Sequence, residues 1–244
     1  MFLAPPPDPE KRLSLSDTFA FSCHSGLSCF NQCCRNKYLP LTPYDVLRMR
    51  KALGLHSDKF LERYAVYGLD PASGFPILSI RMDDADGRCP FLSPKGCSIY
   101  QDRPMACRLY PLGRSCRPGR NGTSSEVFFH LLDTPHCQGI KEDRVRTVAA
   151  WQEEQGLLPY LEVNDRMLGL LFHPKRDRAL PLTERQQQKV LVACYNIDVF
   201  KEFIVKTGWP RSPDNGNGPL GSVMENDSAL LAYGFAYLDQ ALFP

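Results

Sequence analysis

Cysteine is the residue type in this sequence whose number and positions point most directly to chemistry. The chain of 244 residues holds ten cysteines, and nine of them fall between Cys23 and Cys137, where an even distribution would place fewer than five. Thiolates bind soft or borderline metals, chiefly zinc, cuprous copper and iron–sulfur clusters. Because four thiolates complete one tetrahedral zinc site or one four-iron cluster, the sequence supplies either two sites or one site with additional structural or redox cysteines.

The spacing of the cysteines leaves the identity of the metal open. Zinc knuckles usually supply ligands in pairs about two to four residues apart, and iron–sulfur proteins often use short cysteine runs. Only Cys29 with Cys33 or Cys34 has such a spacing, and the next three cysteines are widely separated. Adjacent residues project in different directions, so we expect Cys33 and Cys34 not to chelate one metal side by side. One binds metal, and the other serves a second metal, a cluster edge or the core.

Positive charge is concentrated around the later cysteines. The segment 88–120 carries seven basic residues and one acid, Asp102, in a chain whose net charge is only +2. These cations could offset the negative charge of thiolates around a metal, bind a small anion, or contact nucleic acid. A nearly neutral chain with little aromatic interleaving and no helix-turn-helix spacing disfavours nucleic acid. Arg103 and Arg108 flank Cys107 and are candidates for binding the cofactor or an anion; alternatively, they fasten loops through backbone carbonyls or Asp102.

Several motifs resemble the YkgJ-type cysteine-cluster proteins, whose CxxCxxCC-type domain is described as zinc- or iron-chelating. The resemblance covers roughly residues 19–140, and its first block, Phe21 to Arg35, is more widely spaced than is usual in the family. The second block consists of Cys89-Pro-Phe-Leu, Gly96-Cys97-Ser-Ile-Tyr100, Arg103-Pro104 and Cys107-Arg-Leu-Tyr-Pro111, and Cys137-Gln-Gly139 resembles the final Cys-x-Gly. The metal ligands that the resemblance implies are Cys23, Cys29, Cys33, Cys34, Cys89, Cys97, Cys107 and Cys137.

The resemblance implies a metal-binding module that holds an iron–sulfur cluster, in particular 4Fe–4S, or Zn²⁺. Two functional classes follow: a redox or metal-handling module, and a metal- or cluster-dependent enzyme acting on an anionic or protein substrate. One branch with this type of domain resembles flagellin lysine methylases, which use S-adenosylmethionine. No glycine-rich strand-to-helix turn suited to that cofactor occurs in the sequence, which disfavours the methylase. The expected partners are the metal or cluster and a protein, with no membrane and no nucleic acid.

The pattern of the whole chain predicts an α+β fold. A Pro-rich arm at 1–14 precedes a small, irregular, metal-stapled module with short strands at 15–140, and a mainly helical region at 141–244 packs on that module. Thr42 and Asp45 form a capping-box pattern for a helix that closes at Gly54, and a second helix is expected from Ser57 to Tyr64. Alternating apolar residues predict a strand over 75–82, and a second strand is expected over 127–132.

The region after residue 140 contains four expected helices. Thr183 with Gln186 forms a second capping-box pattern, and Gly208 suits a C-terminal stop. Four glycines and two prolines mark 211–221 as a loop or linker. The expected helices lie near 141–155, 160–172, 184–206 and 227–241.

The remaining cysteines, two histidines and the N-terminal sequence complete the expectations. The first residues lack a basic start and an apolar stretch, and no run of about 18 apolar residues occurs, so we expect a cytoplasmic protein with reduced thiols. His24 and His136 each adjoin a cysteine and are either ligands or neighbours of ligands. Cys116 has no obvious counterpart in the family, and Cys194 lies on an apolar helix face, where it is expected to pack in the core.

Overall fold

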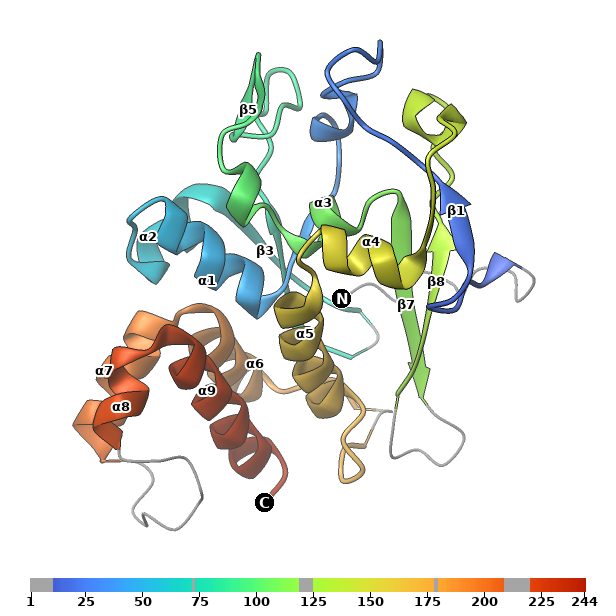
Figure 1. Cartoon of the computed structure of the whole chain (residues 1–244). Helices are drawn as coiled ribbons and strands as arrows, with labels where there is room; N and C mark the ends of the chain where they lie inside the picture. Colours follow the sequence, from blue (N-terminus) through green and yellow to red (C-terminus); the bar gives the residue numbers. More distant parts are fainter. Residues whose placement is uncertain (1–10, 72, 119–124, 178–179, 209–219) are drawn as a thin grey trace.

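The fold is mixed α+β, as the sequence predicts, with short strands in the N-terminal part and mainly helices in the C-terminal part (Figure 1). The computed structural model describes residues 11–71, 73–118, 125–177, 180–208 and 220–244. Residues 1–10 of the predicted arm lie outside these ranges, whereas Leu13 pairs with Phe129 through two backbone hydrogen bonds. Most of the predicted loop at 211–221 also lies outside them, and a helix begins at Leu220.

The strand pairs of the described residues are all antiparallel and form four small sheets. The pairs β1–β9, β5–β6 and β7–β8 stand alone, and the fourth sheet has the order β2–β4–β3. The predicted strand at 127–132 is confirmed as part of β8. The strands are β1 (Thr18–Ala20), β2 (Pro40–Leu41), β3 (Ala65–Leu69), β4 (Pro76–Ile80), β5 (Leu92–Ser93), β6 (Gly96–Cys97), β7 (Leu112–Pro118), β8 (Ser125–Leu131) and β9 (Val145–Thr147).

The predicted helix signals at both capping boxes are confirmed. The Thr42 hydroxyl accepts from the Asp45 backbone N–H and the Asp45 carboxylate accepts from the Thr42 N–H, and Thr183 and Gln186 make the same exchange. Gly208 ends its helix in the left-handed conformation, at φ 62°. The helices are α1 (Pro43–Ala52), α2 (Ser57–Tyr64), α3 (Met105–Leu109), α4 (Val148–Glu154), α5 (Leu158–Leu171), α6 (Glu184–Val190), α7 (Ile197–Thr207), α8 (Leu220–Glu225) and α9 (Asp227–Leu242).

The strand expected at 75–82 is confirmed as β4, which is buried along its whole length. All five residues of β4 are buried, including Ser79. β4 is the middle strand of its sheet, paired with β2 on one edge and β3 on the other, and its Leu78 and Ile80 belong to the larger hydrophobic core. Because five consecutive residues of β4 are buried, both of its faces are covered, and the alternation of apolar residues does not mark an exposed face.

The helix expected at 141–155 is wrong over its first half. Residues Val145–Thr147 form β9, which pairs with β1 across more than a hundred residues of sequence. Thr147 then caps α4, because its hydroxyl accepts from the Ala150 N–H at 3.1 Å. A non-local strand pair has therefore overridden the local helical preference.

The single helix expected at 184–206 is interrupted. It consists of α6, a π-helical turn at Leu191–Tyr195 and α7, with Asn196 between them at φ −103° and ψ 61°. Ser57 at the start of α2 explains the break: its backbone N–H donates to Asp198 Oδ2 at 2.7 Å, and its hydroxyl accepts from the Asp198 N–H at 3.1 Å. The starts of α2 and α7 thus cap each other, which stabilises both helix ends.

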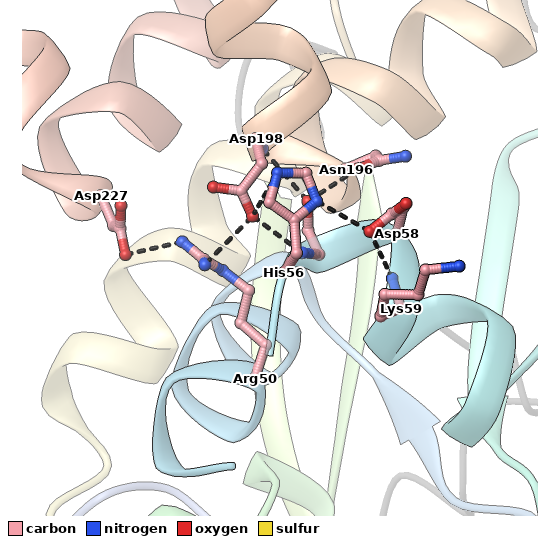
Figure 2. A network of polar contacts seen from close by, with 8 residues as sticks. Arg50, His56, Asp58, Lys59, Asn196, Asp198 and Asp227 are labelled. Atoms are coloured by element: carbon pink, nitrogen blue, oxygen red, sulfur yellow. Dashed lines mark hydrogen bonds and ion pairs between the residues drawn. The ribbon is translucent and has the colours of Figure 1, made fainter. Parts of the chain in front are cut away.

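A polar network beside this break joins the first helices to the last ones (Figure 2). The guanidinium of Arg50, at the end of α1, lies 3.1 Å from Asp198 Oδ2 and 2.6 Å from Asp227 Oδ2. The side chain of Arg50 is only 9 % exposed, so the two carboxylates neutralise a nearly buried cation. His56 extends the network to Asp58 at 2.7 Å.

Two hydrophobic cores lie behind the loops that carry cysteines. The larger core collects side chains from α1, β4, α5, α7 and α9, and it contains fully buried Cys194, as expected. The smaller core surrounds Trp151, whose ring meets Phe19 and Phe21 edge-to-face and whose indole N–H donates to the Leu109 carbonyl at 3.1 Å. In the described part of the chain, no helix combines the length and the apolar character needed to cross a membrane.

Replacing Arg50 tests how strongly the network holds the two parts together. We expect Arg50→Met to lower the free energy of unfolding by about 2 kcal/mol, because it leaves two partly buried carboxylates without their cation. Urea denaturation would measure the change. Lys59→Met is the matched control, since Lys59 and Glu62 are both well exposed and their pair contributes little. Equal stability of both variants would contradict a structural role for the Arg50 network.

Candidate metal centre

Three chain segments rise side by side at the end of the molecule opposite the C-terminal helices (Figure 1). They are the loop that follows β1, the β5–β6 hairpin, and the turn that precedes β9. Between these segments and α3 lies an open cavity of about 510 Å³. All eight cysteines that the resemblance implies as ligands line this cavity: Cys23, Cys29, Cys33, Cys34, Cys89, Cys97, Cys107 and Cys137.

One wall of the cavity forms where the loop after β1 meets the turn before β9. The Ser22 N–H donates to the Gly139 carbonyl at 3.0 Å, and the Gln138 N–H donates to the Cys29 sulfur at 3.2 Å. A side chain at Gly139 would stand 2.6 Å from the Ser22 carbonyl oxygen and 2.8 Å from the Phe21 ring. The glycine therefore permits the close approach of the two segments.

The opposite wall forms where the end of the first loop meets the second cysteine group. The Cys89 N–H donates to the Cys34 carbonyl at 2.9 Å, next to a bridge between Arg35 and Arg88. Cys97 follows Gly96 in the β5–β6 hairpin, and the φ angle of 109° at Gly96 favours glycine at that position. Cys107 lies on the one-turn helix α3.

Buried groups behind the cavity hold α3 in place. Arg108 donates to three backbone carbonyls: Arg103 at 3.0 Å, Gln155 at 2.7 Å, and Gln101. Arg103 donates to the Tyr100 carbonyl at 2.6 Å and to the Gln155 side chain at 2.5 Å. These bonds support the loop-fastening role for both arginines. Arg103 also lines the cavity, whereas Asp102, the expected acidic partner, pairs with Arg48 at 2.6 Å instead.

The buried carboxylate of Asp45 connects α1 to the same helix. Its Oδ1 accepts from the Met105 N–H at 2.7 Å, while Oδ2 accepts from the Thr42 backbone and hydroxyl at 2.7 and 2.8 Å. Asp45 is fully buried, and this desolvation raises its pKa to about 6 despite the three hydrogen bonds. One side chain therefore caps α1 and fixes the start of α3.

The thiols of the cavity are free, and most are partly shielded from solvent. Cys89 and Cys137 are buried, whereas Cys23 and Cys33 are exposed. Burial, together with the charges of Cys33, Cys29 and Cys137, raises the pKa of Cys23 to about 11. Burial and the charges of neighbouring thiols, Cys89 first among them, also raise the pKa of Cys107. Crowding of this kind disfavours several thiolates together without a compensating cation.

The donor set of the cavity fits a thiophilic metal. Among the described residues that line it, eight are cysteines and none is Asp or Glu. In the described ranges, no three His, Cys, Asp or Glu side chains already converge closely enough to hold a metal ion. The thiols thus line a cavity without converging on one point, so binding of a metal would have to draw some of them together.

Three of the seven basic residues near the later cysteines are paired with carboxylates of the protein. Arg114 pairs with Asp165, Arg117 pairs with Glu126 at 2.6 Å, and Arg88 lies 3.8 Å from Asp86. Lys95 and Arg103 are the cations of this segment that line the cavity, and in the described part of the chain neither forms an ion pair. Of the two histidines beside cysteines, His136 lines the cavity, whereas His24 lies 3.5 Å from Glu142.

Comparison with known proteins assigns this part of the chain to a family. Residues 22–138 match the family model CxxCxxCC, which is described as a "Putative zinc- or iron-chelating domain". The chain carries a CxxCxxCC domain. The match spans all eight cysteines of the cavity and agrees with the resemblance seen in the sequence. No curated protein and no solved structure matched the chain.

The CxxCxxCC domain depends on residues whose roles the sequence alone did not reveal. Gln155 lies beyond the domain, yet its side chain and backbone carbonyl bind Arg103 and Arg108. Tyr110, within the Cys107 motif, lines the cavity, and burial together with a hydrogen bond to Cys137 raises the pKa of its phenol. The position of Tyr110 within the Cys107 motif could have predicted its place beside the cavity. No sequence pattern around Gln155 predicts its contacts with the two arginines.

The pKa of Asp45 predicts a distinct pH dependence. A folded-state pKa of about 6, above the ordinary value of 3.8 for an aspartate, means that the folded protein favours the protonated carboxyl. The corresponding stability is complete below about pH 4 and is lost as the pH rises through 6. Replacing Asp45 by Asn should therefore cost more stability near pH 4 than at pH 7, by on the order of 3 kcal/mol.

Urea denaturation of the metal-free wild-type chain and the Asp45→Asn variant from pH 4 to pH 7 would measure this difference. Metal-free protein is used because protonation of thiolate ligands would otherwise add its own pH dependence. A difference in stability that is independent of pH would show that Asp45 has an ordinary pKa in the folded chain.

Proposed function

We propose that the cavity of the CxxCxxCC domain binds an iron–sulfur cluster and that the chain is a redox or metal-handling protein. The observation that carries the proposal is a single cavity lined by eight cysteines and, among its described lining residues, no carboxylate. Thiolate-only ligation is the chemistry of iron–sulfur clusters and of structural zinc, and it suits neither magnesium nor calcium.

The size of the cavity supports a cluster over a lone zinc ion. Four thiolates bind zinc at about 2.3 Å, so the sulfurs of a zinc site must lie within about 4 Å of one another. The described thiols do not converge in this way, and the open cavity that they line together with other residues has a volume of about 510 Å³. A cluster fills more space because bridging sulfides separate its irons, each of which takes one cysteine.

The contacts of the two arginines favour this function over the alternative of an enzyme acting on an anionic substrate. The guanidinium groups of Arg103 and Arg108 already donate to protein oxygens, which limits what they can offer a substrate. Lys95 remains as a cavity cation without an ion pair in the described part of the chain. Positive charge next to thiolates stabilises the more negative, reduced state of a cluster.

Anaerobic purification with an absorption spectrum and elemental analysis of one sample tests the proposal. We expect a brown protein with broad visible absorption, iron and acid-labile sulfide, and a reversible change of the spectrum on reduction. A colourless protein with zinc and no iron would overturn the cluster and leave a structural domain. A labile iron that exchanges with small ligands would favour the enzyme.

Metal removal should loosen the cysteine-rich part of the chain more than its C-terminal helices. The ligands lie in separate chain segments, so metal binding adds directly to the stability of their arrangement. We expect chelation to lower the melting temperature by on the order of 10 °C while most helical circular dichroism persists below the transition. Unchanged melting after verified metal loss would contradict a structural contribution of the metal.

A further inference from the structure

The eight thiols of the cavity divide into two sets of four by the backbone contacts of the segments that carry them. The outer set is Cys23, Cys29, Cys33 and Cys137. Its members belong to the loop after β1 and to the turn before β9, which are joined by the bonds Ser22–Gly139 and Gln138–Cys29. It contains both exposed thiols of the cavity.

The inner set is Cys34, Cys89, Cys97 and Cys107. Here the Cys34 carbonyl accepts from the Cys89 N–H, and Cys97 is tied to the same strand region because it pairs with Leu92 across the β5–β6 hairpin. Cys107 reaches this wall from α3, which Asp45 anchors through the Met105 N–H. None of the inner thiols is fully exposed.

The adjacent pair Cys33 and Cys34 lies where the two sets meet. The Cys34 carbonyl accepts from the Cys89 N–H of the inner set, whereas the loop that carries Cys33 is joined through Cys29 to the turn that carries Cys137.

We propose that the cavity holds two metal centres, one ligated by the outer set and the other by the inner set. This inference rests on the proposed function, because it assumes that the cavity binds metal. Each set alone completes the four thiolate positions of a tetrahedral zinc ion or of a four-iron cluster. The adjacent pair Cys33–Cys34 supplies one ligand to each centre. Both residues can therefore bind metal in one cavity without chelating the same metal side by side.

Metal stoichiometry in matched double variants of the full-length chain tests the division. The chain is reconstituted anaerobically with ferrous iron and sulfide, and separately with zinc alone. We expect Cys23→Ser with Cys29→Ser, and equally Cys89→Ser with Cys97→Ser, to lower the metal content by about half. Combining all four substitutions should remove nearly all of it. Cys116→Ser with Cys194→Ala is the control, since neither residue lines the cavity, and it should retain the wild-type content.

A measurement on the wild-type chain keeps the test independent of variant folding. Zinc titration should reach about two ions per chain, with the eight cavity cysteines protected from alkylation and identified by mass spectrometry. In the iron-loaded, reduced protein, two neighbouring clusters should show a magnetically coupled electron spin resonance signal that either double variant converts to a simple one.

Different results overturn the two-centre arrangement and the proposed function. One metal centre with only four protected cysteines would overturn the division into two sets. So would complete metal loss in both double variants, provided that their far-ultraviolet circular dichroism matches the wild type. A wild-type chain that binds no iron–sulfur cluster would instead overturn the proposed function itself, whereas two zinc ions in such a chain would leave the division into two sets intact.

Discussion

The cavity depends on the buried guanidinium of Arg108, because loops of irregular structure cannot hold eight thiols apart from one another unaided. Three backbone carbonyls accept its hydrogen bonds, and they come from the turn before α3, from Arg103 and from the end of α4. The same guanidinium lies 4.6 Å from the centre of the Tyr160 ring of α5. One planar cation with several fixed donors therefore fastens the loop that carries Cys107 to the helices behind it. A lysine could not reproduce these contacts, since it offers a single point of charge.

This fastening leaves the thiols themselves with little support. Carbonyls and carboxylates behind the cavity accept hydrogen bonds from the protein, and the fully buried Asp45 is an example. The thiols, in contrast, line the open cavity. Burial and mutual proximity raise the pKa of several of them, including Cys23, Cys89 and Cys107. A metal that binds thiolates removes this electrostatic cost, because its positive charge replaces the protons. The polar groups of the scaffold thus have partners within the protein, whereas the thiols would obtain theirs from the metal of the proposed function.

Local sequence signals predicted the parts of this structure that local interactions form. The capping boxes at Thr42 and Thr183 and the stop at Gly208 depend on residues within one helical turn, and all three are present. The family-like motif likewise identified the cysteines that line the cavity. The errors arose where contacts between distant segments determine the secondary structure. Residues of β9 form a strand instead of a helix because β1 pairs with them. The helix α7 is separate from α6 because Ser57 of α2 exchanges hydrogen bonds with Asp198 at the start of α7. The contacts of Gln155 are of the same kind, since they join positions about fifty residues apart.

The adjacency of Cys33 and Cys34 constrains how two centres in this cavity would behave. Consecutive α-carbons are about 3.8 Å apart, so centres that take one ligand each from this pair must be close neighbours. Cys34 is also joined by its carbonyl to Cys89, while the preceding loop is joined through Cys29 to the turn that carries Cys137. Filling the inner set fixes Cys34 and hence orders the loop that presents Cys33 to the outer set. Since a second ligand then pays less conformational entropy, the two sets should load cooperatively, with the exposed outer centre filled last and lost first.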